Sequence, residues 1–116
     1  MAFQLAWTPE ASRQYAELKD AAASAAATRK KSKKRKSSKQ EGLFKQVHKC
    51  VTFLRDNPRH PGLQTHEFDS LTHPYDTSAK VFEAYAQNRT PGAYRVFWCY
   101  GPTKTKLTII AITPHP

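Results

Sequence analysis

The segment that decides the fold reads AYRVFWCY, residues 93–100, and a second apolar segment, LTIIAI, follows at residues 107–112. Aromatic and β-branched residues dominate both segments, as is typical of β-strands. The turn between them, residues 101–104, begins with glycine and proline, so the two segments are predicted to pair as an antiparallel hairpin. Arg95 is the only charge inside the first segment, and a charge in such a strand requires a reason.

Two further strands are predicted outside this hairpin. Residues 79–86 contain alternating apolar positions and are joined to the hairpin by a turn at residues 88–92. Residues 2–7 alternate as well, and they place three large apolar side chains on one side of a short strand.

Two helices are predicted between the first strand and the last three. The first begins with Thr8-Pro9-Glu10, which supplies a capping hydroxyl, a proline at the first helical position and an early acid. Apolar and alanine-rich sequence continues it to about Ala27. The second is predicted from about Glu41 to Arg55, where apolar residues recur at helical spacing, and Asn57-Pro58 ends it.

The predicted order is β-α-α-β-β-β, which is an α+β fold. We expect the helices to form a hairpin packed on one face of a twisted, mainly antiparallel four-stranded sheet, within a single domain spanning residues 1–116. Residues 59–78 are expected to form a long loop before the last three strands. Since the helices cover one face of the sheet, the other face is expected to be free to bind a ligand.

The formal net charge of +10 comes mainly from one short segment. Residues 29–39 contain eight of the 19 basic residues and no acid, which leaves 11 basic residues against all nine acidic ones elsewhere. This basic run has no apolar face, so we expect a solvated connection between the helices or a frayed helix end. Such a cluster strengthens binding to nucleic acid through counterion release, without sequence preference.

Other classes of protein are disfavoured by composition. No stretch approaches the roughly 18 to 20 apolar residues of a membrane span, and the N-terminal residues lack the basic start and long apolar centre of a signal peptide. We therefore expect a cytoplasmic protein that does not associate with a membrane. Cys50 and Cys99 are too few for a disulfide framework and are predicted to be buried, reduced thiols.

Several segments, in their order and spacing, resemble the RelE/ParE toxin superfamily of bacterial type II toxin–antitoxin modules. They are Trp7-Thr8-Pro9, residues 57–63 (NPRHPGL), 64–66 (QTH), 81–85 (VFEAY), 94–97 (YRVF) and 112–115 (ITPH). The resemblance spans nearly the whole chain, with the basic run at residues 29–39 as an apparent insertion in a RelE-like toxin domain. It implies a toxin that an antitoxin encoded beside it neutralises. RelE-like members cleave mRNA on the ribosome, whereas ParE-like members poison DNA gyrase.

The resemblance also implies roles for residues of the sheet. The family arginine on the penultimate strand falls on Arg95, where it contacts the substrate phosphate. The histidine that ends the last strand in some members falls on His115, and a strand acid of several members falls on Glu83. One register places Glu83 and Arg95 on the same face of the sheet, but sequence alone does not determine that register.

The chemistry of RNA cleavage without a metal supports the same candidates. The neighbouring 2′-hydroxyl is the nucleophile, so the reaction needs a base for it, a cation for the phosphate and an acid for the leaving oxygen. The planar fork of Arg95 suits the phosphate, and His115 suits either proton-transfer role. Glu83 is either the base or the residue that orients a histidine or Arg95. His66 is a further catalytic candidate.

Further candidate contacts to RNA are mostly basic residues. The full set is Arg95, His60, Lys30, Lys31, Lys33, Lys34, Arg35 and Lys36. No cofactor and no metal are expected, because the histidines of the loop and the C-terminus lack the ligand spacing of a zinc site.

The leading hypothesis is a RelE-type toxin, a metal-independent endoribonuclease that cleaves mRNA on the ribosome. Its expected partners are a cognate antitoxin, mRNA and the ribosome. One alternative is a protein of the same fold without nuclease activity, either a ParE-like gyrase inhibitor or a degenerate toxin. Another is a small basic nucleic-acid-binding protein unrelated to toxins.

Overall fold

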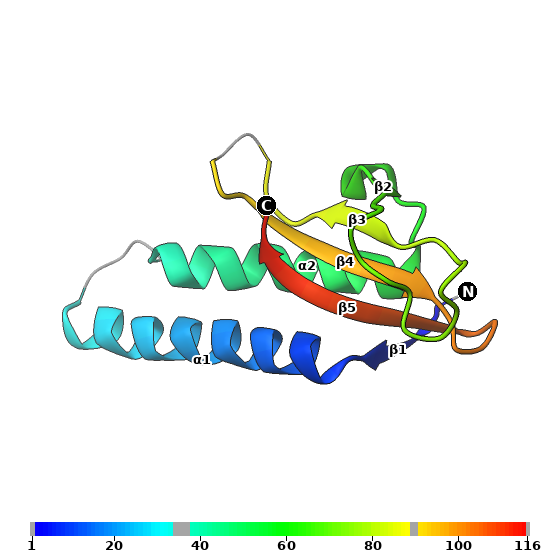
Figure 1. Ribbon diagram of the computed structural model, residues 1–116. Coiled ribbons are helices and arrows are strands. Elements are labelled where there is room, and N and C mark those ends of the chain that lie inside the picture. The colour runs from blue at the N-terminus through cyan, green and yellow to red at the C-terminus, as the bar shows by residue number, and fades with distance from the viewer. Residues whose placement is uncertain (1, 34–37, 89–90, 116) are drawn as a thin grey trace.

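Two long helices lie side by side against one face of a five-stranded sheet (Figure 1). The computed structural model describes residues 2–33, 38–88 and 91–115. The elements are β1 (Gln4–Trp7), α1 (Pro9–Lys31), α2 (Lys39–Asp56), the short 3₁₀ helix η1 (Pro61–Leu63), β2 (His66–Glu67), β3 (Phe82–Tyr85), β4 (Tyr94–Tyr100) and β5 (Lys106–Pro114). The strand order is β1-β5-β4-β3-β2, in which β1 runs parallel to β5 and the other pairs are antiparallel. The predicted α+β class is confirmed.

The sheet has one strand more than the four predicted. β2 lies inside the segment expected to be a loop, and its residues His66 and Glu67 pair with β3. A strand of two residues shows no alternation in the sequence, so periodicity could not reveal it. β3 is also shorter than the predicted strand at 79–86, because the Ala79 amide donates to the Asp76 carbonyl in a turn.

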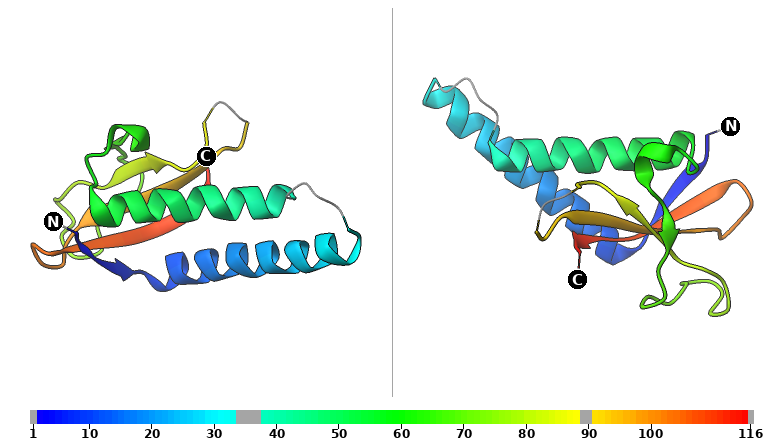
Figure 2. Two further views of the ribbon diagram at one scale, coloured as in Figure 1. Left: turned by 180° about the vertical axis from the view of Figure 1, so that it is seen from behind. Right: turned by 90° about the horizontal axis from the view of Figure 1, so that it is seen from above.

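Both helices continue into the basic run at residues 29–39. α1 ends at Lys31 and α2 begins at Lys39, whereas the predicted ends lay near Ala27 and Glu41. Lysine and arginine are good helix formers, so a run without an apolar face still extends a helix that is already nucleated. The helices form the predicted hairpin, and Figure 2 shows its end projecting beyond the sheet.

The core fills the space between the helices and one face of the sheet. Its buried residues include Val47, Cys50, Val51 and Leu54 of α2 and Ala84, Val96, Trp98, Leu107, Ile109 and Ile112 of the strands. Cys50 and Cys99 are buried free thiols, as predicted, and burial raises their pKa values to about 12 and about 11. None of the described helices is long and apolar enough to cross a lipid bilayer.

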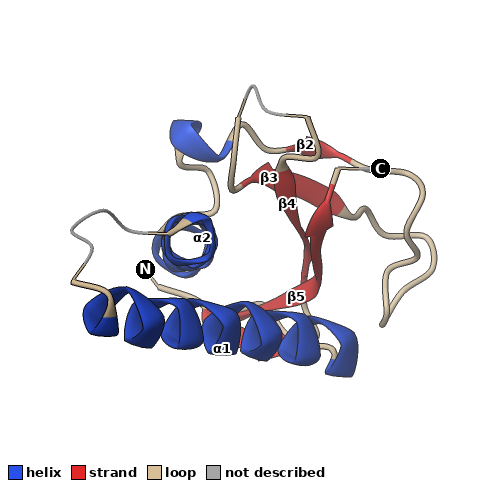
Figure 3. Cartoon of the chain, turned by 90° about the vertical axis from the view of Figure 1, so that its left-hand side faces the viewer, coloured by secondary structure: helices blue, strands red, loops and turns tan. Residues whose placement is uncertain are grey.

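The opposite face of the sheet is not open, and the prediction of a free face was wrong in this respect. The segment between β2 and β3 folds over it (Figure 3), so that the rings of Phe68 and Phe97 lie 4.6 Å apart. Thr108 of β5 donates to the Tyr75 hydroxyl of the same segment at 3.1 Å. The segment between β2 and β3 therefore partly covers the polar residues on this face of the sheet.

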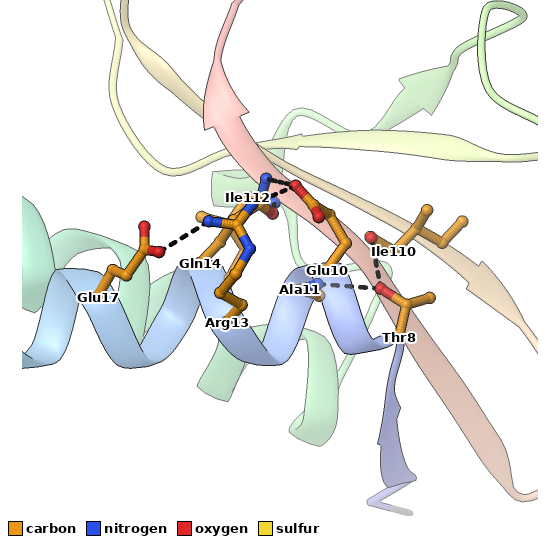
Figure 4. Close-up of polar contacts among 8 residues, drawn as sticks. All are labelled: Thr8, Glu10, Ala11, Arg13, Gln14, Glu17, Ile110 and Ile112. Atoms are coloured by element: carbon orange, nitrogen blue, oxygen red, sulfur yellow. Dashed lines mark hydrogen bonds and ion pairs between the residues drawn. The ribbon is translucent and has the colours of Figure 1, made fainter.

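The free edge of β5 is held by side chains of α1 (Figure 4). β1 pairs with β5 as far as Ile109. Beyond that point the Thr8 hydroxyl donates to the Ile110 carbonyl at 2.7 Å, and the Gln14 side-chain oxygen accepts from the Ile112 amide at 2.7 Å. These bonds take the place of a strand partner along the part of β5 that β1 does not reach.

Replacing Gln14 by alanine is expected to lower the free energy of unfolding by about 1–3 kcal/mol, because it leaves a buried backbone amide without an acceptor. The matched control is Arg13→Ala, since Arg13 only forms exposed pairs with Glu10 and Glu17. We expect this control to change the stability far less. Urea denaturation of the two variants measures the difference, and equal losses would contradict the role of Gln14.

Candidate functional site

A buried carboxylate, that of Glu83, lies at the centre of the candidate site. Glu83 is in the middle of β3 and is 1% exposed. Its oxygen Oε1 contacts a histidine, whereas Oε2 is buried without a hydrogen-bond partner in the described part of the chain. Removing a carboxylate from water is unfavourable unless charges or hydrogen bonds compensate for it, so the groups around Glu83 determine its state.

His66 is the residue that holds Glu83. The two are directly paired in the β2–β3 ladder, and Nε2 of His66 lies 2.6 Å from Oε1 of Glu83. The other ring nitrogen, Nδ1, lies 3.1 Å from the Gln64 carbonyl oxygen. Both nitrogens thus face acceptors, and the ring donates to both only when it carries two protons. The carboxylate of Glu83 and the Gln64 carbonyl therefore fix the orientation of the His66 ring.

His115 approaches Glu83 from the other side. It follows β5 directly, and its backbone amide donates to the Ala93 carbonyl at 2.8 Å, which extends the pairing beyond the last strand residue. Its Nε2 lies 3.8 Å from Oε2 of Glu83, and its side chain is 47% exposed. The buried carboxylate therefore lies between a histidine that it contacts closely and an accessible histidine that follows β5.

Arg95 lies on the same face of the sheet, at the start of β4. It is paired with Tyr85, and Glu83 is paired with Phe97, so the register that the sequence left open does place Glu83 and Arg95 on one face. No ion pair joins these two residues, both of which lie in the described part of the chain. The guanidinium instead lies 3.7 Å from the centre of the Tyr85 ring.

The guanidinium of Arg95 is anchored at one end only. Its Nη1 donates to the carbonyl oxygens of Gln87 at 2.8 Å and Tyr94 at 3.3 Å. Nε is buried and has no hydrogen-bond partner among the described residues. Arg95 is only 8% exposed, so a partly desolvated cation with unused donor capacity stands beside the two histidines and Glu83.

The other predicted contact residues are distributed differently. His60 begins η1, where its Nδ1 accepts from the Gly62 amide at 2.9 Å and its ring stacks on Phe53 at 4.1 Å. His73 is buried, and its Nε2 lies 2.9 Å from the Tyr100 carbonyl oxygen. Both histidines therefore support local structure and do not join the group around Glu83.

The basic residues of the run lie away from the sheet. Lys30, Lys31 and Lys33 are found at the end of the helical hairpin, where all three are exposed. The remaining candidates of the run, Lys34, Arg35 and Lys36, lie outside the described residues.

Two residues of the site were not among the predicted functional residues. Tyr85 supports the Arg95 guanidinium, and its alternation with Glu83 on one strand face was a signal that pointed to it. Gln87 contributes a backbone carbonyl, which every residue type has, so its sequence carried no such signal. Among residues 2–33, 38–88 and 91–115, no group of three or more His, Cys, Asp or Glu side chains is placed to hold a metal ion.

The fold and the position of these residues at its sheet define a known structural class. No protein-family model matches the chain, and no curated protein sequence matches it. A YoeB/ParE toxin from Agrobacterium tumefaciens superposes with a TM-score of 0.59 at 10% identity, covering 97% of this chain and 99% of that chain. The YoeB dimer from Staphylococcus aureus gives a TM-score of 0.57 at 8% identity, with 100% of both chains covered.

The chain therefore has the fold of the YoeB/ParE toxins, which are members of the RelE/ParE toxin superfamily. The resemblance inferred from the sequence is confirmed in its fold. At these identities the likeness concerns the fold, and the chemistry must be argued from the residues of this chain.

Proposed function

We propose that this protein is the toxin of a type II toxin–antitoxin module and that it cleaves mRNA on the ribosome as a metal-independent endoribonuclease. The observation that carries the proposal is the buried Glu83 carboxylate between His66 and His115, beside the guanidinium of Arg95. A cation and a group of proton carriers on one sheet face are what cleavage by a 2′-hydroxyl requires. The fold of the YoeB/ParE toxins supports an antitoxin as the partner.

Arg95 is assigned to the phosphate. Its buried guanidinium needs no large rearrangement to meet the charge that develops on the non-bridging oxygens, because Tyr85 and Gln87 already hold it. Such preorganised charge acts more strongly in a site that excludes water than on an open surface.

His115 is assigned to the leaving group. It is accessible, and its Nε2 lies 3.8 Å from the Oε2 of Glu83. His115 then protonates the 5′-oxygen as the bond from phosphorus to that oxygen breaks. The proton of the 2′-hydroxyl goes to the half-exposed ring of His66, and Oε1 of Glu83 stabilises the imidazolium that forms. The products are a 2′,3′-cyclic phosphate and a 5′-hydroxyl.

The sequence left open whether Glu83 is the base or the residue that orients its neighbours, and its burial bears on that choice. A side chain that is 1% exposed does not reach a substrate directly. The geometry thus favours Glu83 as the residue that sets the position and charge of its histidines over Glu83 as a base acting alone.

The test is to induce the protein in bacteria, map transcript ends, and repeat the cleavage with purified protein and ribosomes. We expect new mRNA ends that carry 2′,3′-cyclic phosphates, and no cleavage when the attacking nucleotide lacks its 2′-hydroxyl. Cleavage of that deoxy substrate would contradict the mechanism. Intact transcripts together with inhibited DNA supercoiling would instead identify a gyrase inhibitor.

A further inference from the structure

The end of the helical hairpin is held together by a specific ion pair. Arg29 of α1 donates from Nε and Nη2 to the two carboxylate oxygens of Glu41 in α2, at 2.9 and 3.1 Å. The same carboxylate accepts from the backbone amide of Ser38, the residue that caps α2. Two parallel charge-assisted bonds fix direction as well as distance, so the hairpin is a defined arm and not a frayed end.

The state of this ion pair depends on pH in a known direction. Hydrogen bonding to Arg29 holds the pKa of Glu41 below its usual range. A lowered carboxyl pKa means that the contact contributes its stability above the ordinary pKa and loses it as the pH falls through the lowered value. The ion pair between Arg29 and Glu41 therefore holds the two helices together throughout the neutral pH range.

The lysines of α2 are not neutralised by the acidic residues of the same helix. The two acids of this helix are each paired, Glu41 with Arg29 and Asp56 with Arg55. The exposed lysines of the helix and of the hairpin end, among the described residues, are Lys30, Lys31, Lys33, Lys39, Lys45 and Lys49. The molecule measures 51 × 26 × 25 Å along its principal axes, and Figure 2 shows the hairpin extending along the longest direction.

The lysines of α2 lie on one face of the helix. Lys39, Lys45 and Lys49 fall within about one third of the helix circumference and span about 15 Å along its axis. The buried residues Val47 and Val51 face the sheet from the other side of the helix. A row of positive charges thus runs along the solvent side of α2.

This row leads to the candidate site through direct contacts. Gln46, on the same side of α2, accepts from the Gln87 side chain at 2.9 Å, and the Gln87 carbonyl is the one that holds Arg95. Lys49 and Gln46 also line a surface hollow together with Tyr85, the residue under the Arg95 guanidinium. The cationic row therefore begins at the rim of the site and ends at the tip of the arm.

We propose that the solvent side of α2 and the end of the hairpin form a track that binds the sugar–phosphate backbone of RNA, leading from the Arg95 site along Lys49, Lys45 and Lys39 to the tip. The identity of the RNA rests on the proposed function. On that basis the track takes the strand that flanks the cleaved bond, because the row of lysines begins at the rim of the Arg95 site.

The test compares Lys45→Gln/Lys49→Gln with Lys104→Gln/Lys106→Gln, both in a His115→Ala background so that the RNA stays intact. Lys104 and Lys106 lie at the opposite end of β5 from His115, and the charge change is the same. Binding of a fluorescent 20-nucleotide RNA is measured from 50 to 250 mM KCl. The track double variant is expected to lower the slope of log K against log salt by about 1.4 and to bind about 25-fold more weakly at 0.1 M salt.

Equal slopes for the two double variants would overturn the proposal. So would an unchanged RNA affinity accompanied by loss of binding to an acidic peptide. The position of the strand is tested with 4- and 20-nucleotide substrates. A track for the flanking strand predicts a loss for the longer substrate alone, and a loss seen only with ribosomes would overturn it. Because binding is measured without cleavage, absence of nuclease activity in the wild type would refute the proposed function and leave this result intact.

Discussion

Replacing Arg95 by alanine is expected to lower the rate of RNA cleavage by about 10²–10³-fold, because a positioned charge at the phosphate usually contributes strongly to the rate of such a reaction. Arg95 is nearly buried and rests on Tyr85, so water does not replace its charge effectively. Arg95→Lys is also expected to be impaired, since an ammonium lacks the planar fork that bonds two oxygens at once.

The control is Arg55→Ala, which removes the same charge from an exposed ion pair with Asp56 on α2. Single-turnover cleavage with purified ribosomes measures the chemical step, and urea denaturation shows whether each variant stays folded. A folded Arg95→Ala protein that cleaves at the wild-type rate would contradict the assignment. Rescue of growth arrest by this variant, without rescue by the control, is the corresponding result in cells.

Most of the fold could be predicted because its elements have clear periodicity. The two helices and the long strands bury one face, so their apolar spacing is readable. β2 could not be predicted, because it is defined by hydrogen bonds to β3 and not by its own residues. The covered face was missed for a similar reason, since Phe68 and Tyr75 reach the sheet from a segment without regular structure.

The sequence suggested the candidate residues of the site but not the contacts between them. The resemblance to the toxin superfamily and the type of residue pointed to Arg95, Glu83 and His115, and the observed register places Glu83 and Arg95 on one face. The contact between His66 and Glu83 depends on the two-residue strand β2. A sequence indicates that a carboxylate and a histidine are present, whereas their 2.6 Å contact and the burial of Glu83 arise from tertiary packing.

The group around Glu83 allows the two proton transfers to be distinguished. His115→Ala is expected to lower the cleavage rate of an ordinary RNA by about 10²–10⁴-fold, the usual contribution of a positioned acid or base. The decisive substrate carries sulfur in place of the 5′-bridging oxygen at the cleaved bond. A thiolate leaves without protonation, so this substrate is expected to restore the rate of His115→Ala to near that of the wild type.

Glu83→Gln and His66→Gln are expected to behave differently from His115→Ala. Each keeps a hydrogen-bonding side chain but removes the ionisable group of one member of the His66–Glu83 pair, and so affects the acceptance of the hydroxyl proton. The sulfur substrate is not expected to rescue either variant. It removes the need to protonate the leaving group, whereas these variants affect the removal of the proton from the 2′-hydroxyl. The control His48→Gln changes an exposed histidine that contacts Tyr15 between the helices and should keep full activity.

The cleavage rate of a double variant of Glu83 and His66 tests the role of Glu83 in a second way. If Glu83 acts by setting the position and charge of its histidines, then Glu83→Gln combined with His66→Gln is expected to be about as slow as the slower single variant, since residues that act as a unit are not additive. Multiplicative losses would show that Glu83 and His66 act separately. Rescue of Glu83→Gln by the sulfur substrate would assign Glu83 to the leaving group and contradict the role given to His115.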